Sequence, residues 1–574
     1  MSATFDSRWL IAALAPYVHD FVVAAGSRSA PLAYAVADAE SRGMVTAHPF
    51  FDERAAGFFA LGLAQSTGRP VAVLTTSGTA PAHLLPAVIE AYHTGVPLIV
   101  ISADRPFEMH GSGASQTTNQ VGLFGSHVVG ELDIPANIGI TGTSIEEDAR
   151  ARAFVARVRR LVGAAVGAGG VGGPVHINIA FRDPLVPGEE PSVADLNIGK
   201  PWDLRPREPR VTAWEDAVLP LRTVIVAGDK AAGAGELALA AGVPLLAEPS
   251  SGYFGSPASS PHQQQMLTRF SSQIEQVVVV GHPSLSRPVS RLLAGSARIV
   301  VVAREREYTD VAGAADLVVE ALAPAREKMD EAWAATWSEH AANISAWLDS
   351  REMLQIMGES EGLPDGVLAA RAVWDAYASD PSHALVLGAS NSIRYVDLAA
   401  SKPVSGPAEP VFAARGQAGI DGTIAAAKGI AQTKPVRVLL GDLTFMHDMN
   451  SLLTRAGEDT PPIDLVVIDD GGGRIFKSLE HGLAPEDLYE RFFAISHSVD
   501  YEALARATGW GYVKVDFSST EEAGSPRNST ANALDVLTRA LAEKPSGRII
   551  HVVARHGDVR DEVRSLFPEN VQEA

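Results

Sequence analysis

Short runs of apolar, β-branched residues recur along the chain and are separated by longer Ala-rich stretches. These runs are apolar throughout rather than alternating, which is typical of parallel strands covered by helices on both faces. The stretches between them, such as 55–65 and 530–542, are long enough for helices. The pattern therefore predicts an α/β fold, with strands at 71–74, 97–103, 175–180, 223–227, 277–281, 298–302, 384–388, 436–441, 463–469 and 548–554.

Two stretches have the composition of domain boundaries. Residues 184–209 hold six prolines among scattered acids, a composition that packs badly and usually bridges domains. Residues 358–364, Gly-Glu-Ser-Glu-Gly-Leu-Pro, follow a long helical segment that bears Trp and Ala. A chain of 574 residues is also too long for a single core. We expect three parallel-sheet α/β domains, over 1–184, 185–357 and 358–574.

Composition removes several classes of function. The chain carries 68 acidic and 47 basic residues, a net charge of −21, which disfavours nucleic acid and anionic lipid as partners. It has no cysteine, so disulfides, Cys-ligated metals and thiolate nucleophiles are excluded. No apolar run approaches the ~18 residues of a membrane span, and the N-terminus lacks the basic start of a secretory signal. We expect a cytoplasmic protein with no nucleic-acid or membrane partner.

Acidic residues follow two of the predicted strands. Asp442 comes directly after 436–441, and Asp469, 27 residues later, ends the strand 463–469 and is followed by Asp470 and three glycines. The carboxyl ends of parallel strands border the crevice where α/β sheets bind ligands. Two carboxylates and a glycine carbonyl suit a hard divalent cation that holds a phosphate. The sequence predicts magnesium bound by Asp442, Asp469 and Gly471, with a helix cap and a solvated acidic turn as the structural alternatives.

This spacing resembles the fingerprint of thiamine-diphosphate-dependent enzymes, a Gly-Asp-x followed after a little under thirty residues by an acidic or Asn-bearing turn. Further motifs resemble one branch of these enzymes, the 2-succinyl-5-enolpyruvyl-6-hydroxy-3-cyclohexene-1-carboxylate synthases (MenD family). Gly-Asp-Leu at 441–443 has that branch's form, while Asp469 stands where relatives often carry Asn and Arg474 resembles an insertion. The motifs lie at 26–32, 52–54, 75–80, 102–106, 113–120, 414–423, 441–445 and 471–476.

The resemblance implies a fold, cofactors and a reaction. It implies the three-domain thiamine-diphosphate arrangement, in which 1–184 binds the pyrimidine and 358–574 binds the diphosphate and metal. The cofactors would be thiamine diphosphate and Mg²⁺, or Mn²⁺ in its place. 2-Oxoglutarate would be decarboxylated and the four-carbon product added to isochorismate in menaquinone biosynthesis.

The resemblance also implies roles for single residues. Glu53 would be catalytic, through a hydrogen bond to pyrimidine N1′. The alternative for Asp52 or Glu53 is an acid that stabilises a helix N-terminus. The implied cofactor contacts are Glu53, Asn391, Ile420, Asp442, Leu443 and Thr444.

Both implied substrates are dicarboxylates, so a chain of charge −21 needs local cations to bind them. Arginine suits the bidentate grip of a carboxylate, although each arginine could equally form a surface salt bridge. In the central block Arg287 and Arg291 are alternatives for one contact, and we interpret His447 and His481 as structural histidines. The implied substrate contacts are Ser27, Arg28, Arg105, Gln116, Arg291, Ser390, Arg394, Arg415, Ile475 and Phe476.

Three other functions are compatible with parts of the sequence. They are a thiamine-diphosphate enzyme that acts on pyruvate, a nucleotide- or flavin-binding protein, and a non-catalytic relative. For a nucleotide- or flavin-binding protein, the sequence lacks both the Gly-x-Gly-x-x-Gly fingerprint and the phosphate-binding loop. A non-catalytic relative would be expected to have lost Glu53 or the metal acids, and all of them are present. The family resemblance also implies a homodimer or homotetramer whose sites take Glu53 from one chain and Asp442 from another. Both halves meeting within one chain is the alternative.

Overall fold

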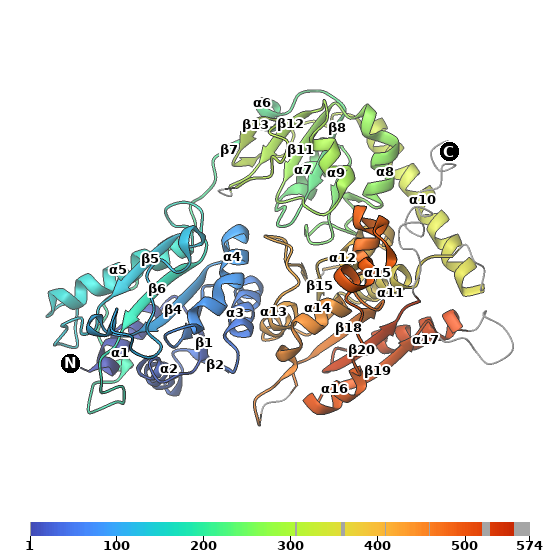
Figure 1. The fold of residues 1–574 in the computed structure, drawn as a ribbon. Coiled ribbons are helices and arrows are strands. Elements are labelled where there is room, and N and C mark those ends of the chain that lie inside the picture. Colours follow the sequence, from blue (N-terminus) through green and yellow to red (C-terminus); the bar gives the residue numbers. More distant parts are fainter. Residues whose placement is uncertain are drawn as a thin grey trace. The chain divides into compact units, whose positions relative to one another are not determined.

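The structure, a computed structural model, describes residues 2–304, 307–357, 362–407, 409–457, 460–518 and 529–555. These residues form two compact units (Figure 1). The first comprises the described residues within Met1–Glu208, Asp421–Thr433 and Asp448–Glu458, and the second comprises the remainder. The predicted boundary at 358–364 lies partly outside the described residues, which omit 358–361.

A six-stranded parallel sheet in the order β2-β1-β3-β4-β6-β5 forms the centre of the first unit. Alternate residues of each strand serve opposite faces: Phe21 and Val23 pack with α1, α2 and α5, whereas Val22 and Ala24 pack with α3 and α4. Both faces are therefore buried, as the continuous apolar runs predict. The elements are α1 (Ala3–Leu14), β1 (Asp20–Ala24), α2 (Ala30–Ser41), β2 (Thr46–Phe50), α3 (Glu53–Thr67), β3 (Val71–Thr75), α4 (Leu85–Thr94), β4 (Leu98–Asp104), β5 (Gly130–Ile134), α5 (Ala149–Ala165) and β6 (Val175–Ala180).

Helix α13 (Thr423–Ile430), from the last third of the sequence, belongs to the first unit and packs on α3. The backbones approach closely, since a Cβ on Gly62 would lie 2.0 Å from the Ala426 carbonyl oxygen. Buried Asp448 links the two helices, because it accepts a hydrogen bond from Ala425 N of α13 (2.9 Å) and lies 3.5 Å from Arg54 Nη2 of α3. The predicted range 358–574 thus contributes two segments to the first unit.

The second unit contains two six-stranded parallel sheets and one two-stranded pair, β14-β7. One sheet has the order β10-β9-β8-β11-β12-β13, and the other has the order β16-β15-β17-β18-β20-β19. The first sheet and its helices are β7 (Val211–Thr212), α6 (Trp214–Ala217), β8 (Thr223–Ala227), α7 (Ala234–Ala241), β9 (Leu245–Ala247), β10 (Ser259–Ser260), α8 (Gln263–Phe270), β11 (Gln276–Val280), α9 (Arg287–Leu293), β12 (Arg298–Val302), β13 (Ala315–Val319), β14 (Ala321–Leu322) and α10 (Glu331–Met357). The second comprises α11 (Asp365–Ser379), β15 (Ala384–Leu387), α12 (Asn391–Ala399), β16 (Val411–Phe412), β17 (Val436–Gly441), α14 (Asp442–His447), β18 (Ile463–Asp469), α15 (Glu486–Tyr489), α16 (Tyr501–Thr508), β19 (Gly511–Asp516), α17 (Ser529–Ala542) and β20 (Arg548–Val553).

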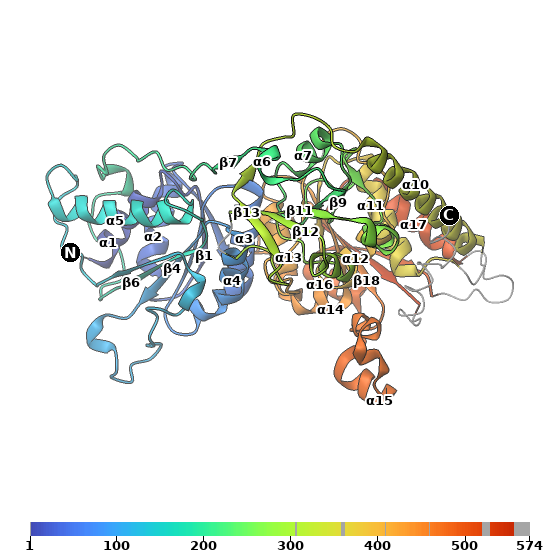
Figure 2. The same ribbon diagram turned by 90° about the horizontal axis from the view of Figure 1, so that it is seen from above.

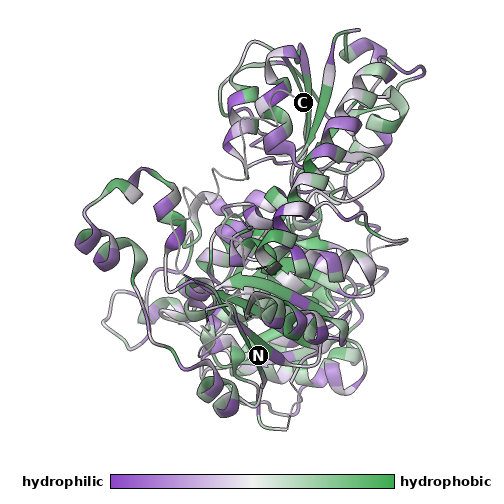
Figure 3. Ribbon diagram, turned by 90° about the vertical axis from the view of Figure 1, so that its right-hand side faces the viewer, coloured by the Kyte–Doolittle hydropathy of each residue, from purple (hydrophilic) through white to green (hydrophobic). Residues whose placement is uncertain are grey.

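A single apolar core joins these two sheets. It includes Val277 of β11 and Ile550 of β20, with the fully buried rings of Trp337 and Trp374 among its members. The strands stand out as hydrophobic in Figure 3, while the helices carry mixed hydropathy. The shared core explains why the second and third sheets form one compact unit.

The ten predicted strands are all present, each within about one residue of its predicted ends. All strand pairs in the sheets are parallel, so the predicted α/β fold class is confirmed. Ten further strands of the described residues were not predicted. They include the buried but short β1 and β9, as well as β2, which reads Thr-Ala-His-Pro-Phe, and β19, which carries Lys514 at its exposed centre. Each six-stranded sheet lies within one of the predicted domain ranges, whose boundaries stay a prediction. Among the described helices, none has the length and apolar character needed to cross a bilayer.

Candidate active site

Two acidic residues meet where β17 and β18 end. The two strands are parallel neighbours in which Gly441 is paired with Ile468, so their carboxyl ends lie at the same edge of the sheet. Asp442 follows β17 as the first residue of α14, and Asp469 is the last residue of β18. One ligand atom each from Asp442, Asp469 and His497 lies within 4.8 Å of the others. The structure therefore brings together the two carboxylates of the predicted metal site and adds an imidazole.

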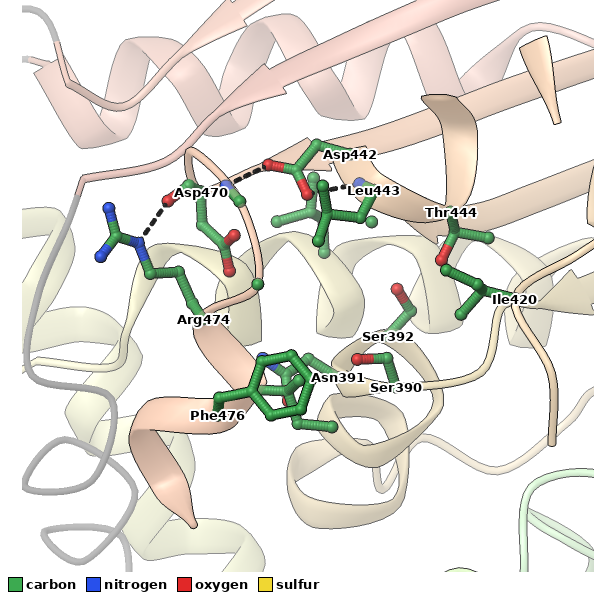
Figure 4. Close-up of a pocket in the computed structure, with 15 residues that line it drawn as sticks. Ser390, Asn391, Ser392, Ile420, Asp442, Leu443, Thr444, Asp470, Arg474 and Phe476 are labelled. Carbon is green, nitrogen blue, oxygen red and sulfur yellow. Dashed lines mark hydrogen bonds between the residues drawn. The ribbon is translucent and has the colours of Figure 1, made fainter. Parts of the chain in front are cut away.

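The Asp442 carboxylate is buried and accepts hydrogen bonds both from its own helix and from the loop that follows β18. Its Oδ1 accepts a hydrogen bond from Leu443 N (2.6 Å), and its Oδ2 accepts one from Gly472 N (2.7 Å). The Oδ2 atom also lies 3.1 Å from His497 Nε2. Burial raises the pKa of Asp442, the hydrogen bond with His497 opposes the rise, and the charge of Asp469 adds to it. The bond to Gly472, which crosses to the next strand's loop (Figure 4), is not that of a helix cap.

Asp469 is held by a histidine and a loop amide. His551 Nε2 lies 2.8 Å from Asp469 Oδ2, and Gly471 N donates to Oδ1 at 3.1 Å. The outer face of His551 is fixed by Tyr512, whose hydroxyl lies 3.0 Å from Nδ1, and by Tyr501, whose ring stacks at 4.1 Å. Burial acts to raise the pKa of Asp469, but the hydrogen bond and charge of His551 outweigh it and the pKa is lowered. Asp469 is therefore kept ionised and oriented, as a metal ligand requires.

A third acid, Asp470, lies beside the pair. Burial, and then the charge of Asp442, raises the pKa of Asp470 well above its usual range, which favours its neutral form. The carboxyl oxygens of Asp442 and Asp469 form a donor set that suits a hard divalent cation. The adjoining backbone has no room for a side chain, since Gly472 has φ +131° and a Cβ there would lie 2.2 Å from the Ala494 oxygen. The residues present thus fit a metal ion with a phosphate ligand.

Asp442 and Asp470 border a pocket of about 140 Å³ in the second unit. In Figure 4, Asp442 and Asp470 lie on one side and Ser390, Asn391 and Phe476 on the other. Ser390 has φ +78° and ψ −136°, a conformation that costs a residue other than glycine roughly 1–3 kcal/mol and persists mainly at functional sites. The lining brings together eight residues predicted to bind cofactor or substrate: Ser390, Asn391, Ile420, Asp442, Leu443, Thr444, Ile475 and Phe476.

Arg474, which resembles an insertion in the sequence, fixes the loop that follows Asp470. Its Nε donates to the Asp470 carbonyl oxygen (3.1 Å), and its Nη1 donates to Glu490 Oε1 (2.7 Å). The 3₁₀ turn Arg474–Ser478 begins at this residue and carries Ile475 and Phe476 into the pocket lining. The extra residue therefore anchors these two apolar side chains.

Two arginines of the second unit carry positive charge near Ser390. Arg394 Nη1 donates to the Ser390 carbonyl oxygen (2.6 Å), and Arg415 is 2% exposed. Burial, and then the charge of Arg415, lowers the pKa of Arg394, and the charge of Arg287 acts in the same direction. Arg291 lies elsewhere, in a separate hollow formed with α8 residues. Of the two alternatives in α9, Arg287 is the one whose charge acts on Arg394, and its Nη2 lies 3.8 Å from Glu480 Oε2.

Glu53 lies in the first unit, at the first position of α3. The cap of that helix is Asp52, whose Oδ1 accepts hydrogen bonds from Arg54 N (2.9 Å) and Ala55 N (3.3 Å). In the part of the chain that the structure describes, the Glu53 side chain has no hydrogen bond or ion pair. Asp52 is thus the residue that caps the helix, whereas the half-buried Glu53 lies in the first helical turn, where an acid also stabilises a helix N-terminus.

The first unit also contains a pair of neighbouring arginines. Arg28, 5% exposed, donates from Nη1 to the Phe181 carbonyl oxygen (2.8 Å), and burial, then the charge of Arg105, lowers its pKa. The Nε atoms of both arginines are buried without a hydrogen-bond partner among the described residues. Ser27 and Gln116 are exposed, and Gln116 has φ +52°. These residues could bind an anion, but no contact of theirs identifies it.

The sequence interpretation missed His497 and His551. His551 had one available signal, a polar residue inside the apolar strand 548–554, whereas His497 lies in an irregular segment that carries no periodic pattern. His447 is exposed and His481 stacks on Phe493 at 4.9 Å, which agrees with the structural role expected of His481. The histidines that touch the acids are thus ones that no motif marked.

Comparison with known proteins agrees with this geometry. Residues 7–123 match the family described as thiamine pyrophosphate enzyme, N-terminal TPP binding domain, and residues 403–534 match the corresponding C-terminal TPP binding domain.

Relatives at full length carry one shared name, 2-succinyl-5-enolpyruvyl-6-hydroxy-3-cyclohexene-1-carboxylate synthase. The protein of Paenarthrobacter aurescens (strain TC1) is 42% identical and covers 88% of each chain. That of Kineococcus radiotolerans is 41% identical over 95% of this chain and 94% of its own, and that of a Nocardioides strain is 38% identical over 99% and 98%. The chain belongs to the 2-succinyl-5-enolpyruvyl-6-hydroxy-3-cyclohexene-1-carboxylate synthase family of thiamine-pyrophosphate enzymes.

Proposed function

We propose that this chain decarboxylates 2-oxoglutarate with thiamine diphosphate and adds the four-carbon product to isochorismate, giving 2-succinyl-5-enolpyruvyl-6-hydroxy-3-cyclohexene-1-carboxylate for menaquinone biosynthesis. The observation that carries the proposal is the convergence of Asp442 and Asp469 beside a pocket whose lining includes the predicted Ile420, Ile475 and Phe476. The reaction takes place in the cytoplasm, where both substrates are dissolved anions.

Asp442, Asp469 and the Gly471 carbonyl would hold Mg²⁺, or Mn²⁺ in its place, and the metal would anchor the diphosphate. When bound, thiamine diphosphate supplies the carbanion stabilisation that decarboxylation and carbon–carbon bond formation need. The protein would orient the cofactor and the substrates and would exclude water from the pocket. Ile420 would lie against the bound cofactor, while Ile475 and Phe476 would exclude water from the pocket.

Glu53 would hold a proton at the pyrimidine N1′ atom. Its carboxylate has no other hydrogen-bond partner within the described residues, and Asp52 already caps the helix. Because Glu53 belongs to the first unit and the metal acids to the second, we propose a homodimer, or a homotetramer built from such dimers, in which each site takes Glu53 from one chain and the acids from another. Residues 1–184, 185–357 and 358–574 would be the pyrimidine-binding, central and diphosphate-binding domains.

The arginines would bind the substrate carboxylates. Arg28 and Arg105 form one cationic group, and Arg394 and Arg415 form the other. Each group includes buried guanidinium atoms without a hydrogen-bond partner among the described residues, at Arg28, Arg105 and Arg415. A carboxylate would satisfy these donors with strong, charge-assisted hydrogen bonds. Ser27, Gln116 and Ser390 would add neutral hydrogen bonds, and Arg291, or Arg287 as its alternative, would add a further contact to a carboxylate.

The decisive assay contains 2-oxoglutarate, isochorismate, thiamine diphosphate and Mg²⁺. We expect loss of 2-oxoglutarate that depends on isochorismate, and little turnover when pyruvate replaces 2-oxoglutarate. Turnover of pyruvate with equal efficiency would instead assign the chain to a pyruvate-acting thiamine-diphosphate enzyme. No turnover of either 2-oxoacid by metal- and cofactor-loaded protein would refute the proposal.

Shared sites are tested by mixing two inactive variants. Co-expressed Glu53→Gln and Asp442→Ala chains should form heterodimers in which one site keeps both residues, so activity should return to roughly half that of the parent per heterodimer. Verified heterodimers without activity, or an active monomer in light scattering, would show that both halves come from one chain.

A further inference from the structure

Among the residues that the structure describes, Arg415 of the second unit has one side-chain hydrogen bond. The residue follows β16, and its Nη2 donates to Ser284 Oγ at 2.7 Å. Its Nε and Nη1 atoms are buried and have no hydrogen-bond partner among the described residues. One part of the guanidinium is therefore fixed, while other donors remain free for an anionic ligand.

Ser284 is in turn held by Glu248, a buried acid that the proposed chemistry does not use. Glu248 follows β9 and is 1% exposed. Its Oε1 accepts hydrogen bonds from Ser284 N (3.0 Å) and Leu285 N (2.8 Å). These bonds fix the segment that leaves β11 and thereby the position of the Ser284 hydroxyl. A continuous series of hydrogen bonds thus runs from Glu248 through Ser284 to Arg415.

The electrostatics favour a neutral Glu248. Burial raises its pKa to about 8, although the charge of Arg415 and the bonds to Leu285 and Ser284 act to lower it and the charge of Asp397 raises it further. The Oε2 atom is buried without a hydrogen-bond partner among the described residues, an arrangement that costs less for a neutral carboxyl than for a carboxylate. A neutral acid can fix the segment without cancelling the positive charge of Arg415.

We propose that Glu248 is a positioning residue: through Ser284 it orients Arg415, so that the free guanidinium donors face a carboxylate of the substrate. This inference rests on the proposed function, in which Arg415 binds a dicarboxylate. Residues of the central sheet would then determine how strongly the enzyme binds its substrate.

The test compares Ser284→Ala, Glu248→Ala and Glu248→Gln by their KM for 2-oxoglutarate and for isochorismate, with kcat and melting temperature measured alongside. Loss of one hydrogen bond to a charged group predicts a KM roughly 10-fold higher for one of the two substrates in Ser284→Ala, with a small change in kcat. Glu248→Ala should show the same rise. Glu248→Gln should stay near the parent, because the amide oxygen still accepts from both N–H groups and the side chain is neutral.

The double variant Glu248→Ala/Ser284→Ala should raise KM no more than either single change, since both act through one series of bonds. Asp365→Ala is the matched control, because Asp365 is a buried acid of the same unit that binds Arg555 instead. It should lower the melting temperature without a change in KM.

Unchanged KM values in Ser284→Ala would overturn the inference, even if Glu248→Ala failed to fold. A lowered melting temperature with unchanged KM in both alanine variants would likewise show a purely structural role. A parent enzyme with no activity on 2-oxoglutarate and isochorismate would instead refute the proposed function, and the inference with it.

Discussion

Replacing His551 with phenylalanine should weaken metal binding while keeping an aromatic ring beside Tyr501. In the parent, His551 Nε2 lies 2.8 Å from Asp469 Oδ2, and its ring stacks on Tyr501 with centroids 4.1 Å apart. Phenylalanine preserves the stacking surface and removes the hydrogen bond. Oδ1 of Asp469 would still accept from Gly471 N (3.1 Å), but Oδ2 would lose the group that orients it.

The size of the effect follows from that one bond. A hydrogen bond to a charged group contributes about 1.5–3 kcal/mol, and about 1.4 kcal/mol corresponds to a tenfold change in affinity. His551→Phe should therefore weaken metal binding about 10- to 100-fold, which is the range found when hydrogen-bond partners of metal ligands are replaced.

The assay is titration of Mn²⁺ into protein saturated with thiamine diphosphate, with free Mn²⁺ followed by electron paramagnetic resonance. Tyr512→Phe is the matched control. It removes the hydroxyl 3.0 Å from His551 Nδ1 but keeps the bond to Asp469, so its effect should be below 10-fold. Parent-like Mn²⁺ affinity in a folded His551→Phe protein would refute the reasoning, and a lowered melting temperature alone would show that His551 serves only the fold.

Three further predictions concern charge and catalysis. Asp464→Ala should lower the free energy of unfolding by about 3–5 kcal/mol in denaturant titrations, because Asp464 is fully buried and pairs with Arg548 (2.6 Å) and Arg437 (3.9 Å). Arg548 would keep its ion pair with Glu543, but the buried Arg437 would lose its counter-charge; a loss below about 1 kcal/mol would contradict this. Glu53→Gln should keep the parent's melting temperature but lower kcat about 10²- to 10⁴-fold, and parent-like turnover would remove Glu53 from the mechanism. Asp442→Ala should abolish thiamine-diphosphate binding at ordinary Mg²⁺ in calorimetry, and equal cofactor affinity of the parent with and without EDTA would disprove the metal assignment.

The sequence predicted the longer buried strands, because a continuous apolar run indicates that both faces of a strand are covered. Strand 463–469 is a clear case, since six of its seven positions are buried. The buried β1 and β9 were missed, because β1 has only five residues and begins with Asp20 and β9 has only three. Edge strands carry a weaker pattern. Strand β19 alternates polar and apolar residues around Lys514, and β2 includes a proline, so neither resembles the central strands in sequence.

The acids of the site were predictable, but their surroundings were not. Asp442 and Asp469 each follow a recognisable strand, and parallel pairing alone brings them to one edge of the sheet. His497 reaches Asp442 from an irregular segment 55 residues later in the chain, a contact that depends on tertiary structure. The packing of α13 on α3 was also unpredictable, because it joins residues more than 350 positions apart through the backbone contact of Gly62.

The site's charges explain how a strongly acidic chain can bind anionic ligands. Asp442, Asp469 and Asp470 crowd together, which disfavours ionisation of Asp442 and Asp470 until a cation neutralises them. A bound divalent metal would turn this negative group into a site for a diphosphate. In the proposed function the chain would bind the substrate carboxylates with buried arginines, and burial raises the pKa of the neighbouring acid Glu248 to about 8, which favours its neutral form at neutral pH. Local burial, rather than the net charge of −21, would then determine which anions the second unit binds.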